Sequence, residues 1–150
     1  MAEKLKILKN IDVANRRASF EYFFLENYTA GIALSGTEIK SIRLGHFNLT
    51  DSYCLFNEGE LYVRNMNISK YEQGTFYNHE PLRDRKLLLK KIELRRLQNK
   101  LKDQGLTMVP TRLFINEKGR AKLEIALAKG KKLYDKRETI KERDLSRERD

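Results

Sequence analysis

The sequence predicts a mainly β protein: a small closed or partly open antiparallel barrel of about six short strands, with one short and one longer helix. Two observations predict this class. Short apolar runs follow one another with Gly- and Asn-containing turns between them, and two other segments show helical spacing. With 150 residues, 40% of them hydrophobic, the chain can form one domain with a real core. Hydrophobic residues almost vanish from about residue 138, so we expect a charged tail that is disordered alone.

The first third of the chain is expected to form strands and then the short helix. Residues 1–15 alternate loosely and fit either an edge strand or an arm. The aromatic residues of Phe20–Leu25 favour a half-buried strand, and a second strand is expected over Tyr28–Leu34. A capping-box pattern begins at Ser35, which predicts a helix over residues 36–44.

Two β-hairpins are expected further along the chain. The first joins Leu49–Phe56 to Leu61–Ile68, and the second joins Leu106–Ile115 to Ala121–Ala128. Each turn contains asparagine and glycine, which tolerate the positive φ that tight hairpin turns require. The last of these strands alternates apolar and polar residues, with Leu123, Ile125 and Leu127 facing inward and Lys122, Glu124 and Ala126 facing outward. Residues 69–82 lack periodicity and are expected to form a loop.

Residues 83–102 form the most basic block of the chain, with nine basic and two acidic residues. Leu87–Leu89 is expected to be a buried extended stretch. A helix is expected over residues 90–104, because three leucines are spaced for one face and Gly105 follows as its cap.

The net charge of +10 favours an acidic partner, either nucleic acid or an anionic membrane surface. No apolar run approaches the ~20 residues of a membrane span, and the apolar stripe of the predicted longer helix is needed for the core. Cys54 is the only cysteine, which excludes an internal disulfide framework and suits a reducing cytoplasm. One cysteine and two histidines, far apart in sequence, argue against a zinc site, so no metal or cofactor is expected.

A search for catalytic residues finds no convergent set. His46 and His79 lie near turns without a partner acid at a recognisable spacing, and Cys54 lies between apolar strand residues, as a buried inert thiol does. Phosphate-binding loops and nucleophile elbows are also missing from the sequence. We therefore expect no enzymatic activity. The alternative left open is an RNA-processing enzyme that uses His46 or His79.

Binding of nucleic acid is better supported. Arg83, Arg85, Lys86, Lys90 and Lys91 can contact phosphates, although the same residues could simply form a solvated helix face. Asn48 and Asp51 could read base edges or cap a turn, and turn capping is favoured on their chemistry alone.

Four motifs, in order along the chain, resemble those of one family. They are A-G-I-A-L-S-G-T-E-I-K-S-I-R from Ala30, N-L-T-D-S-Y from Asn48, R-K-L-L-L from Arg85 and A-K-G-K-K-L-Y-D-K-R from Ala128. Together they resemble the small protein B family, the SsrA-binding proteins of bacteria. The resemblance implies an oligonucleotide-binding-fold barrel and a monomer without enzymatic activity in the bacterial cytoplasm. Such proteins bind the tRNA-like domain of transfer-messenger RNA and deliver it to the vacant A site of stalled ribosomes.

The resemblance also implies two groups of functional residues, one in a barrel domain over residues 1–130 and one in a tail over residues 131–150. The tail would enter the mRNA channel beyond the decoding centre of the small subunit and fold there as a helix. The RNA-binding group comprises Asn15, Arg16, Arg17, Lys40, Arg43, Asn48, Asp51, Ser52, Arg85, Lys86, Leu88, Lys90, Lys122, Lys129 and Gly130. The ribosome-binding group comprises Lys131, Lys132, Tyr134, Asp135, Lys136, Arg137, Lys141 and Arg143.

The chain departs from the family pattern at three positions: Thr29 replaces an acid that some members carry, Lys90 replaces an asparagine and Tyr134 replaces a histidine. Lys90 cannot accept a backbone N–H as an asparagine cap does, so phosphate contact suits it better. Glu38 fits the family motif, yet the capping box explains it, and a structural role is favoured. The alternative function is a general RNA-binding or ribosome-associated protein on the same fold.

Overall fold

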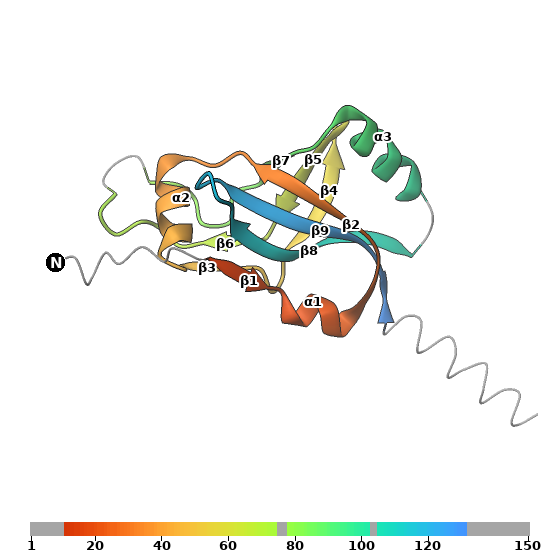
Figure 1. Ribbon diagram of the computed structural model, residues 1–150, viewed down its shortest axis with the longest axis horizontal. Coiled ribbons are helices and arrows are strands. Elements are labelled where there is room, and N and C mark those ends of the chain that lie inside the picture. The colour runs from red at the N-terminus through yellow and green to blue at the C-terminus, as the bar shows by residue number, and fades with distance from the viewer. Residues whose placement is uncertain (1–10, 75–77, 103–104, 132–150) are drawn as a thin grey trace, which may run out of the picture.

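Six antiparallel strands close into a barrel in the computed structural model of the chain, which describes residues 11–74, 78–102 and 105–131 (Figure 1). In order around the ring they are β8 (Leu106–Ile115), β4 (Tyr53–Asn57), β5 (Glu60–Arg64), β7 (Arg85–Leu88), β2 (Tyr22–Ile32) and β9 (Ala121–Gly130). Pairing of β9 with β8 closes the ring. For the described part of the chain, the predicted barrel of about six strands is confirmed.

The strand β1 (Asp12–Ala14) joins the barrel at an edge, where Asp12 lies opposite Phe114 of β8. This agrees with the expected edge strand, although residues 1–10 lie outside the described residues. The helix α1 (Arg16–Glu21) follows at once, and its N-terminus is capped by the Asn15 side chain, which accepts a hydrogen bond from the Ala18 N–H.

The prediction of two strands over Phe20–Leu25 and Tyr28–Leu34 is wrong in detail. Phe20 belongs to α1, and the rest of this segment is one continuous strand, β2. Pairing of β2 with β9 shifts register between Phe24 and Glu26 and then continues. A bulge of this kind bends a strand without ending it, so the small residues beyond it belong to the same strand.

The short helix is confirmed as α2 (Gly36–Arg43). Its capping box is present, since the Ser35 N–H donates to Glu38 at 2.8 Å and the Glu38 N–H donates to the Ser35 hydroxyl at 3.4 Å. Ile42 on its inner face is fully buried. Gly45, with a φ of 78°, follows the last turn in the left-handed conformation that glycine adopts at low cost.

The first hairpin is confirmed but is shorter than predicted. Strands β4 and β5 pair from Tyr53↔Arg64 to Asn57↔Glu60 around a turn in which Gly59 has a φ of 79°. The outer parts form a separate pair, β3 (Phe47–Asn48) with β6 (Asn67–Ile68). The residues after β3 turn instead of continuing the strand, because Ser52 donates both its N–H and its hydroxyl to the Leu49 carbonyl.

The helix α3 (Lys91–Lys100) follows β7 and is shorter than the predicted 90–104. Leu97 is fully buried, and Leu94 and Leu101 pack partly buried against the core, as their spacing predicted. The expectation that Leu87–Leu89 is buried throughout is wrong at Leu88, whose side chain is 52% exposed. Neighbouring residues of a strand face opposite sides, so burial of Leu87 sends Leu88 outward.

The second hairpin is confirmed as β8–β9, and Leu123, Ile125 and Leu127 of β9 face the core. Ala126, predicted to face outward into solvent, is fully buried. The outward face of this part of the hairpin is covered, since Ala128 packs with Val109 and with Ala18 of α1 in a small second cluster.

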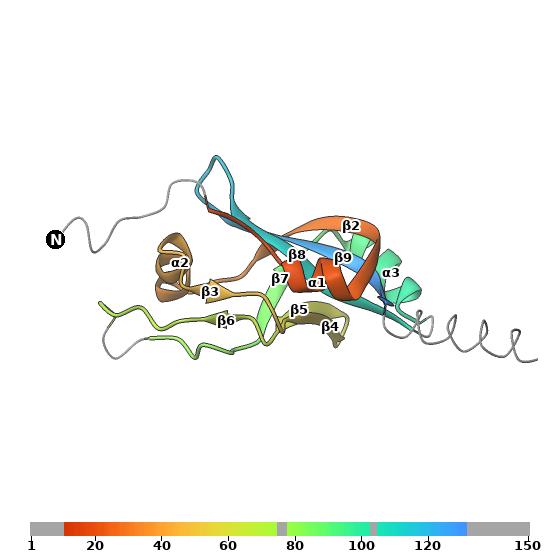
Figure 2. The same ribbon diagram turned by 90° about the horizontal axis from the view of Figure 1, so that it is seen from below.

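Figures 1 and 2 show α2, β3 and β6 together at one end of the long axis, and α3 with the end of β9 at the other. None of the helices among the described residues has the length and apolar character needed to cross a membrane.

Candidate nucleic-acid interface

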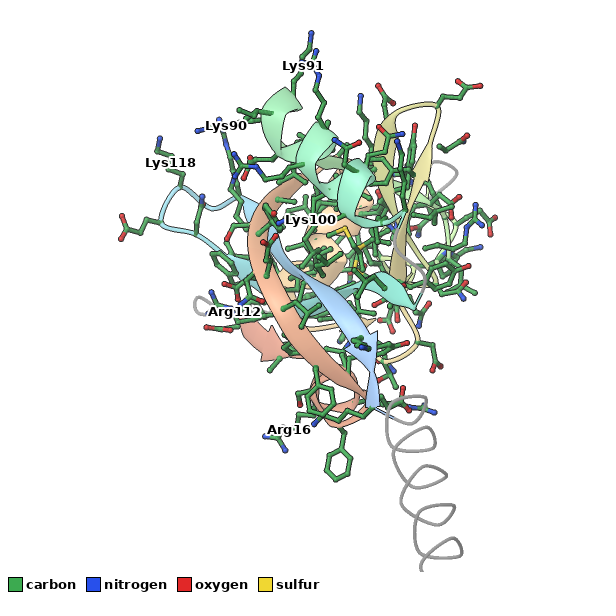
Figure 3. The ribbon with its side chains drawn as sticks, turned by 90° about the vertical axis from the view of Figure 1, so that its right-hand side faces the viewer. Arg16, Lys90, Lys91, Lys100, Arg112 and Lys118 are labelled. Carbon is green, nitrogen blue, oxygen red and sulfur yellow. The ribbon has the colours of Figure 1, made fainter. Side chains whose placement is uncertain are left out.

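Exposed cations lie on opposite sides of the barrel when it is viewed along its long axis. Figure 3 shows Lys90 and Lys91 at the start of α3 on one side, and Arg16 beside the end of β9 on the other. All three side chains are exposed. Such separated groups of cations can contact phosphates of two different nucleic-acid segments.

The first group, which we call the α3 surface, comprises Leu88, Lys90, Lys91 and Ile92. Lys90 gives α3 no side-chain cap, and its own N–H is bound by Glu93 at 3.2 Å, so the ammonium is left for solvent or a partner. Leu88 and Ile92 are 52% and 62% exposed. Lysines beside exposed apolar side chains suit a backbone of phosphates with accessible base or sugar faces next to it.

Arg85 does not belong to this surface, which corrects the prediction that it contacts phosphate. Its side chain is fully buried, and its guanidinium donates at 2.5 Å both to the Glu38 carboxylate and to the Met66 carbonyl. Alternation along β7 was the signal for this: Arg85 and Leu87 face inward, while Lys86 and Leu88 face outward.

Glu38 is the centre of a buried charge cluster. Its carboxylate accepts hydrogen bonds from Arg85 and from Arg83, the latter at 2.5 Å, and it also accepts the Ser35 N–H. Burial opposes ionisation of Glu38, but the hydrogen bonds from Arg83, Ser35 and Arg85 outweigh it and lower its pKa to about 2. The structural role favoured for Glu38 is thus supported, because this cluster ties α2 to β7.

Lowering the pH is expected to remove the stabilisation that Glu38 provides. Its pKa is depressed in the folded state from the usual 4.5 to about 2, so the contribution is complete above about pH 5 and is lost as the pH falls towards 2. The loss should be on the order of 3 kcal/mol in the free energy of unfolding, measured by urea titration at each pH. The variant Glu38→Gln should lose less over this range, and parallel curves for the two proteins would contradict the assignment.

Several other predicted cations are on the surface but already have partners. Lys86 donates to Glu60 at 2.9 Å, and this hydrogen bond raises the pKa of Lys86. The Lys40 ammonium lies 5.5 Å from the centre of the Tyr71 ring. Arg43 donates to the Gly119 carbonyl at 3.2 Å, which connects α2 to the β8–β9 turn. The exposed ion pair of Lys86 is weak, so this lysine can exchange Glu60 for phosphate.

Asn15 and Ser52, predicted to face a partner, are instead buried. The Asn15 amide donates at 3.0 Å to the carbonyls of Leu49 and Pro110, and its oxygen caps α1. The Ser52 hydroxyl donates to the Leu49 carbonyl at 2.6 Å. These side chains therefore hold α1 and the loop before β4 in place, which corrects the expectation of direct contact.

Asn48, Asp51 and Arg17 are exposed near the same loop. The Asn48 side chain accepts the Thr50 N–H at 2.8 Å, as expected of a turn cap. Arg17 pairs with Glu21 at 3.0 Å and with Asp51 at 3.3 Å, beside a pocket of about 250 Å³ between α1 and the start of β4. The pocket opening therefore has both signs of charge, unlike the α3 surface.

The remaining described predictions lie along β9, with Lys122 near its start, opposite Gly31 of β2, and Lys129 and Gly130 at its end. Lys122, Lys129 and Gly130 are half-buried in β9, where Lys129 lies opposite Phe23 and Gly130 opposite Tyr22 of β2. Lys131 donates to the Ser19 carbonyl of α1 at 3.0 Å. The other tail predictions fall outside the described residues: Lys132, Tyr134, Asp135, Lys136, Arg137, Lys141 and Arg143.

Two of the candidate catalytic residues, His79 and Cys54, are buried inside the fold. His79 is buried, with Nε2 2.8 Å from the Ile68 carbonyl and Nδ1 2.9 Å from the Thr37 hydroxyl. Because a carbonyl can only accept, Nε2 carries the proton, and the ring ties the loop after β6 to α2. Cys54 is buried, which raises the pKa of its thiol. Within the described ranges no three His, Cys, Asp or Glu residues are grouped to hold a metal ion.

Comparison with known proteins gives consistent matches over most of the chain. A family model described as SmpB protein matches residues 12–150. The SsrA-binding protein of Cytophaga hutchinsonii is 59% identical over 143 residues, which cover 95% of this chain and 94% of that protein. The SsrA-binding protein of Phocaeicola vulgatus is 61% identical over 140 residues, 93% of each chain. A solved structure entitled "tmRNA-SmpB: a journey to the center of the bacterial ribosome" is 51% identical with a TM-score of 0.68, covering 80% of this chain and 84% of that one.

Proposed function

Since the chain belongs to the SmpB family, we propose that it binds the tRNA-like domain of transfer-messenger RNA and delivers that RNA to the A site of stalled ribosomes. The observation that carries this proposal is the match, at 51% identity, to a structure whose title places SmpB with tmRNA in the bacterial ribosome. The structure supplies a surface suited to the task, because the cations of the α3 surface face outward beside exposed apolar side chains.

The α3 surface suits a folded RNA better than a simple strand of phosphates. Lys90 and Lys91 can neutralise backbone charge, while Leu88 and Ile92 offer apolar area to bases or riboses that a folded RNA presents at its surface. Leu88 lies close over Gly31 of β2, where an added Cβ would come within 3.3 Å of the leucine. An exposed apolar side chain that a strand places beside two lysines can contact a base or ribose while the lysines contact the adjoining backbone.

We also propose a division of labour between the barrel, residues 1–130, and the tail, residues 131–150. The tail begins at the end of β9, on the side of the molecule opposite the start of α3 (Figure 3). One RNA can therefore occupy the α3 surface while the tail reaches a second partner, the mRNA channel of the small subunit. The tail would order only in an empty channel, where new contacts offset its ordering entropy.

The protein would act as a binding adaptor rather than an enzyme, in the bacterial cytoplasm where ribosomes are. Both ring nitrogens of His79 are engaged inside the fold, so this histidine is not available as a general acid or base. His46 is exposed, and no acidic side chain is hydrogen-bonded to it among the described residues.

Replacing both Lys90 and Lys91 with alanine should weaken binding of the isolated tRNA-like domain. Each lysine that contacts a phosphate displaces a counterion. The negative slope of log affinity against log salt should therefore become shallower by about two. The measurement is a binding titration of the full chain at several salt concentrations. Replacing Lys70 and Lys102, two exposed lysines outside the α3 surface, removes the same charge and should leave the slope nearly unchanged.

Three results would count against this proposal. An equal loss in both double variants would mean that net charge alone governs binding. Equal affinity of the wild-type protein for the tRNA-like domain and for an unstructured RNA of the same length would indicate a general RNA-binding protein on this fold. RNA that is cut or altered during long incubation with divalent ions would instead favour the enzyme alternative.

A further inference from the structure

We propose that Phe20 and Phe23, flanked by Arg16 and Lys131, form a stacking site for an unpaired base of the small-subunit ribosomal RNA. We call these four residues the aromatic tip. The inference rests on the proposed function and adds to it a contact made by the barrel itself at the root of the tail. It assigns small-subunit ribosomal RNA to the side of the molecule opposite the start of α3.

The two phenylalanines are placed at the surface rather than in the core. Phe20 is 84% exposed near the end of α1, although Ala18 of the same helix is buried. Phe23 is 41% exposed at the start of β2. Single exposed apolar residues are ordinary on protein surfaces, but here two exposed phenylalanines lie three residues apart, where α1 passes into β2.

Cations flank these rings from two separate segments. Arg16 lies four residues before Phe20 and hence on the same face of α1, and it is exposed. From the end of β9, the Lys131 ammonium lies 5.1 Å from the centre of the Phe23 ring and donates to the Ser19 carbonyl. Figure 3 shows Arg16 and the end of β9 at the same extremity of the molecule.

The combination identifies the occupant as a nucleobase with its phosphate. Exposed rings beside Lys and Arg are how proteins hold unpaired bases, because the ring stacks on the base while the cation meets the backbone. The nearest carboxylate on α1, Glu21, is paired with Arg17, so it does not offset the charge of Arg16 and Lys131. A purely apolar protein partner would gain nothing from these two cations.

The position of the tip selects ribosomal RNA over transfer-messenger RNA. Lys131 is both a member of the tip and the first residue of the tail, so whatever surface receives the tail lies against these rings. We assign transfer-messenger RNA to the α3 surface on the opposite side (Figure 3), which moves Arg16, named above with the RNA-binding residues, to the second RNA partner. The tip therefore faces the small subunit at the entrance to the site that the tail occupies.

The test compares full-length wild-type protein with Phe20→Ala, Phe20→Leu and Phe20→Tyr. Each is titrated against isolated tRNA-like-domain RNA and against vacant small ribosomal subunits. Stacking on one base corresponds to a loss of about fivefold to a hundredfold in subunit affinity for the alanine and leucine variants, with tyrosine close to wild type. Affinity for the tRNA-like domain should stay the same in all four proteins. Because Phe20 is exposed, thermal unfolding should also be unchanged.

Three outcomes would overturn the inference. If Phe20→Leu binds subunits as tightly as wild type, the tip is a general apolar contact and not a stacking site. If Phe20→Ala weakens binding of the tRNA-like domain instead, the tip faces the other RNA. If Phe20→Ala leaves subunit affinity unchanged or raises it, as release of a tail docked on the rings would do, no base is stacked there. Failure of wild-type protein to bind either RNA target would instead defeat the proposed function.

Discussion

Replacing Glu38 with alanine is expected to destabilise the protein by about 3–5 kcal/mol, because Arg85 would stay buried without its carboxylate. Arg85 is fully buried and directly paired with Glu38, and Arg83 would lose the same partner. The capping box of α2 would disappear with it, since the Glu38 side chain binds the Ser35 N–H. Urea unfolding at pH 7 measures the effect.

A matched control is Glu60→Ala, which removes the same side chain from an exposed pair with Lys86 and should cost less than about 1 kcal/mol. A second comparison adds Arg85→Met to Glu38→Ala, which removes the unpaired buried charge and should recover part of the loss. If Glu38→Ala and Glu60→Ala have similar effects, the buried cluster is not what holds α2 against β7. Glu38 would then have a role in RNA binding instead of stability, which a titration of the folded Glu38→Ala protein with the tRNA-like domain would measure.

The hairpins and α2 could be predicted from sequence because their determinants are local. The turn around Gly59 and the capping box from Ser35 to Glu38 each lie within four residues, and the structure contains both. The helix α1 was missed because six residues are too few to show a period, and its cap, Asn15, also depends on the distant carbonyls of Leu49 and Pro110.

The candidate interface was predictable in composition but not in detail. Local charge identified the block that contains Lys90 and Lys91, yet the same charge pattern included Arg85, which is buried against a glutamate 47 positions away. Whether an arginine faces solvent or a buried carboxylate is decided by tertiary packing, and only strand alternation hints at it. Likewise, an aromatic run predicts burial, so the exposure of Phe20 became visible only once α1 was seen to turn it outward.

Deletion of residues 132–150 is expected to abolish tagging on stalled ribosomes while leaving affinity for the tRNA-like domain nearly intact. The deleted segment has seven basic and six acidic residues, so the net charge falls only from +10 to +9. Long-range attraction to RNA is therefore almost unchanged, and the α3 surface is left whole. What is lost is the segment proposed to occupy the empty mRNA channel. Tag addition on ribosomes stalled at the end of a truncated mRNA measures the effect.

The matched control is a full-length chain in which the sequence of residues 132–150 is scrambled, which preserves length, composition and charge. If the tail is recognised through specific side chains such as Tyr134 and Arg137, the scrambled chain should fail like the deletion. If the chain with the scrambled tail supports tagging, the channel accepts any charged segment of this length and composition, whatever its sequence. Loss of affinity for the tRNA-like domain in the deleted chain would show that barrel and tail bind one RNA together, and the division between two RNA partners would then be wrong.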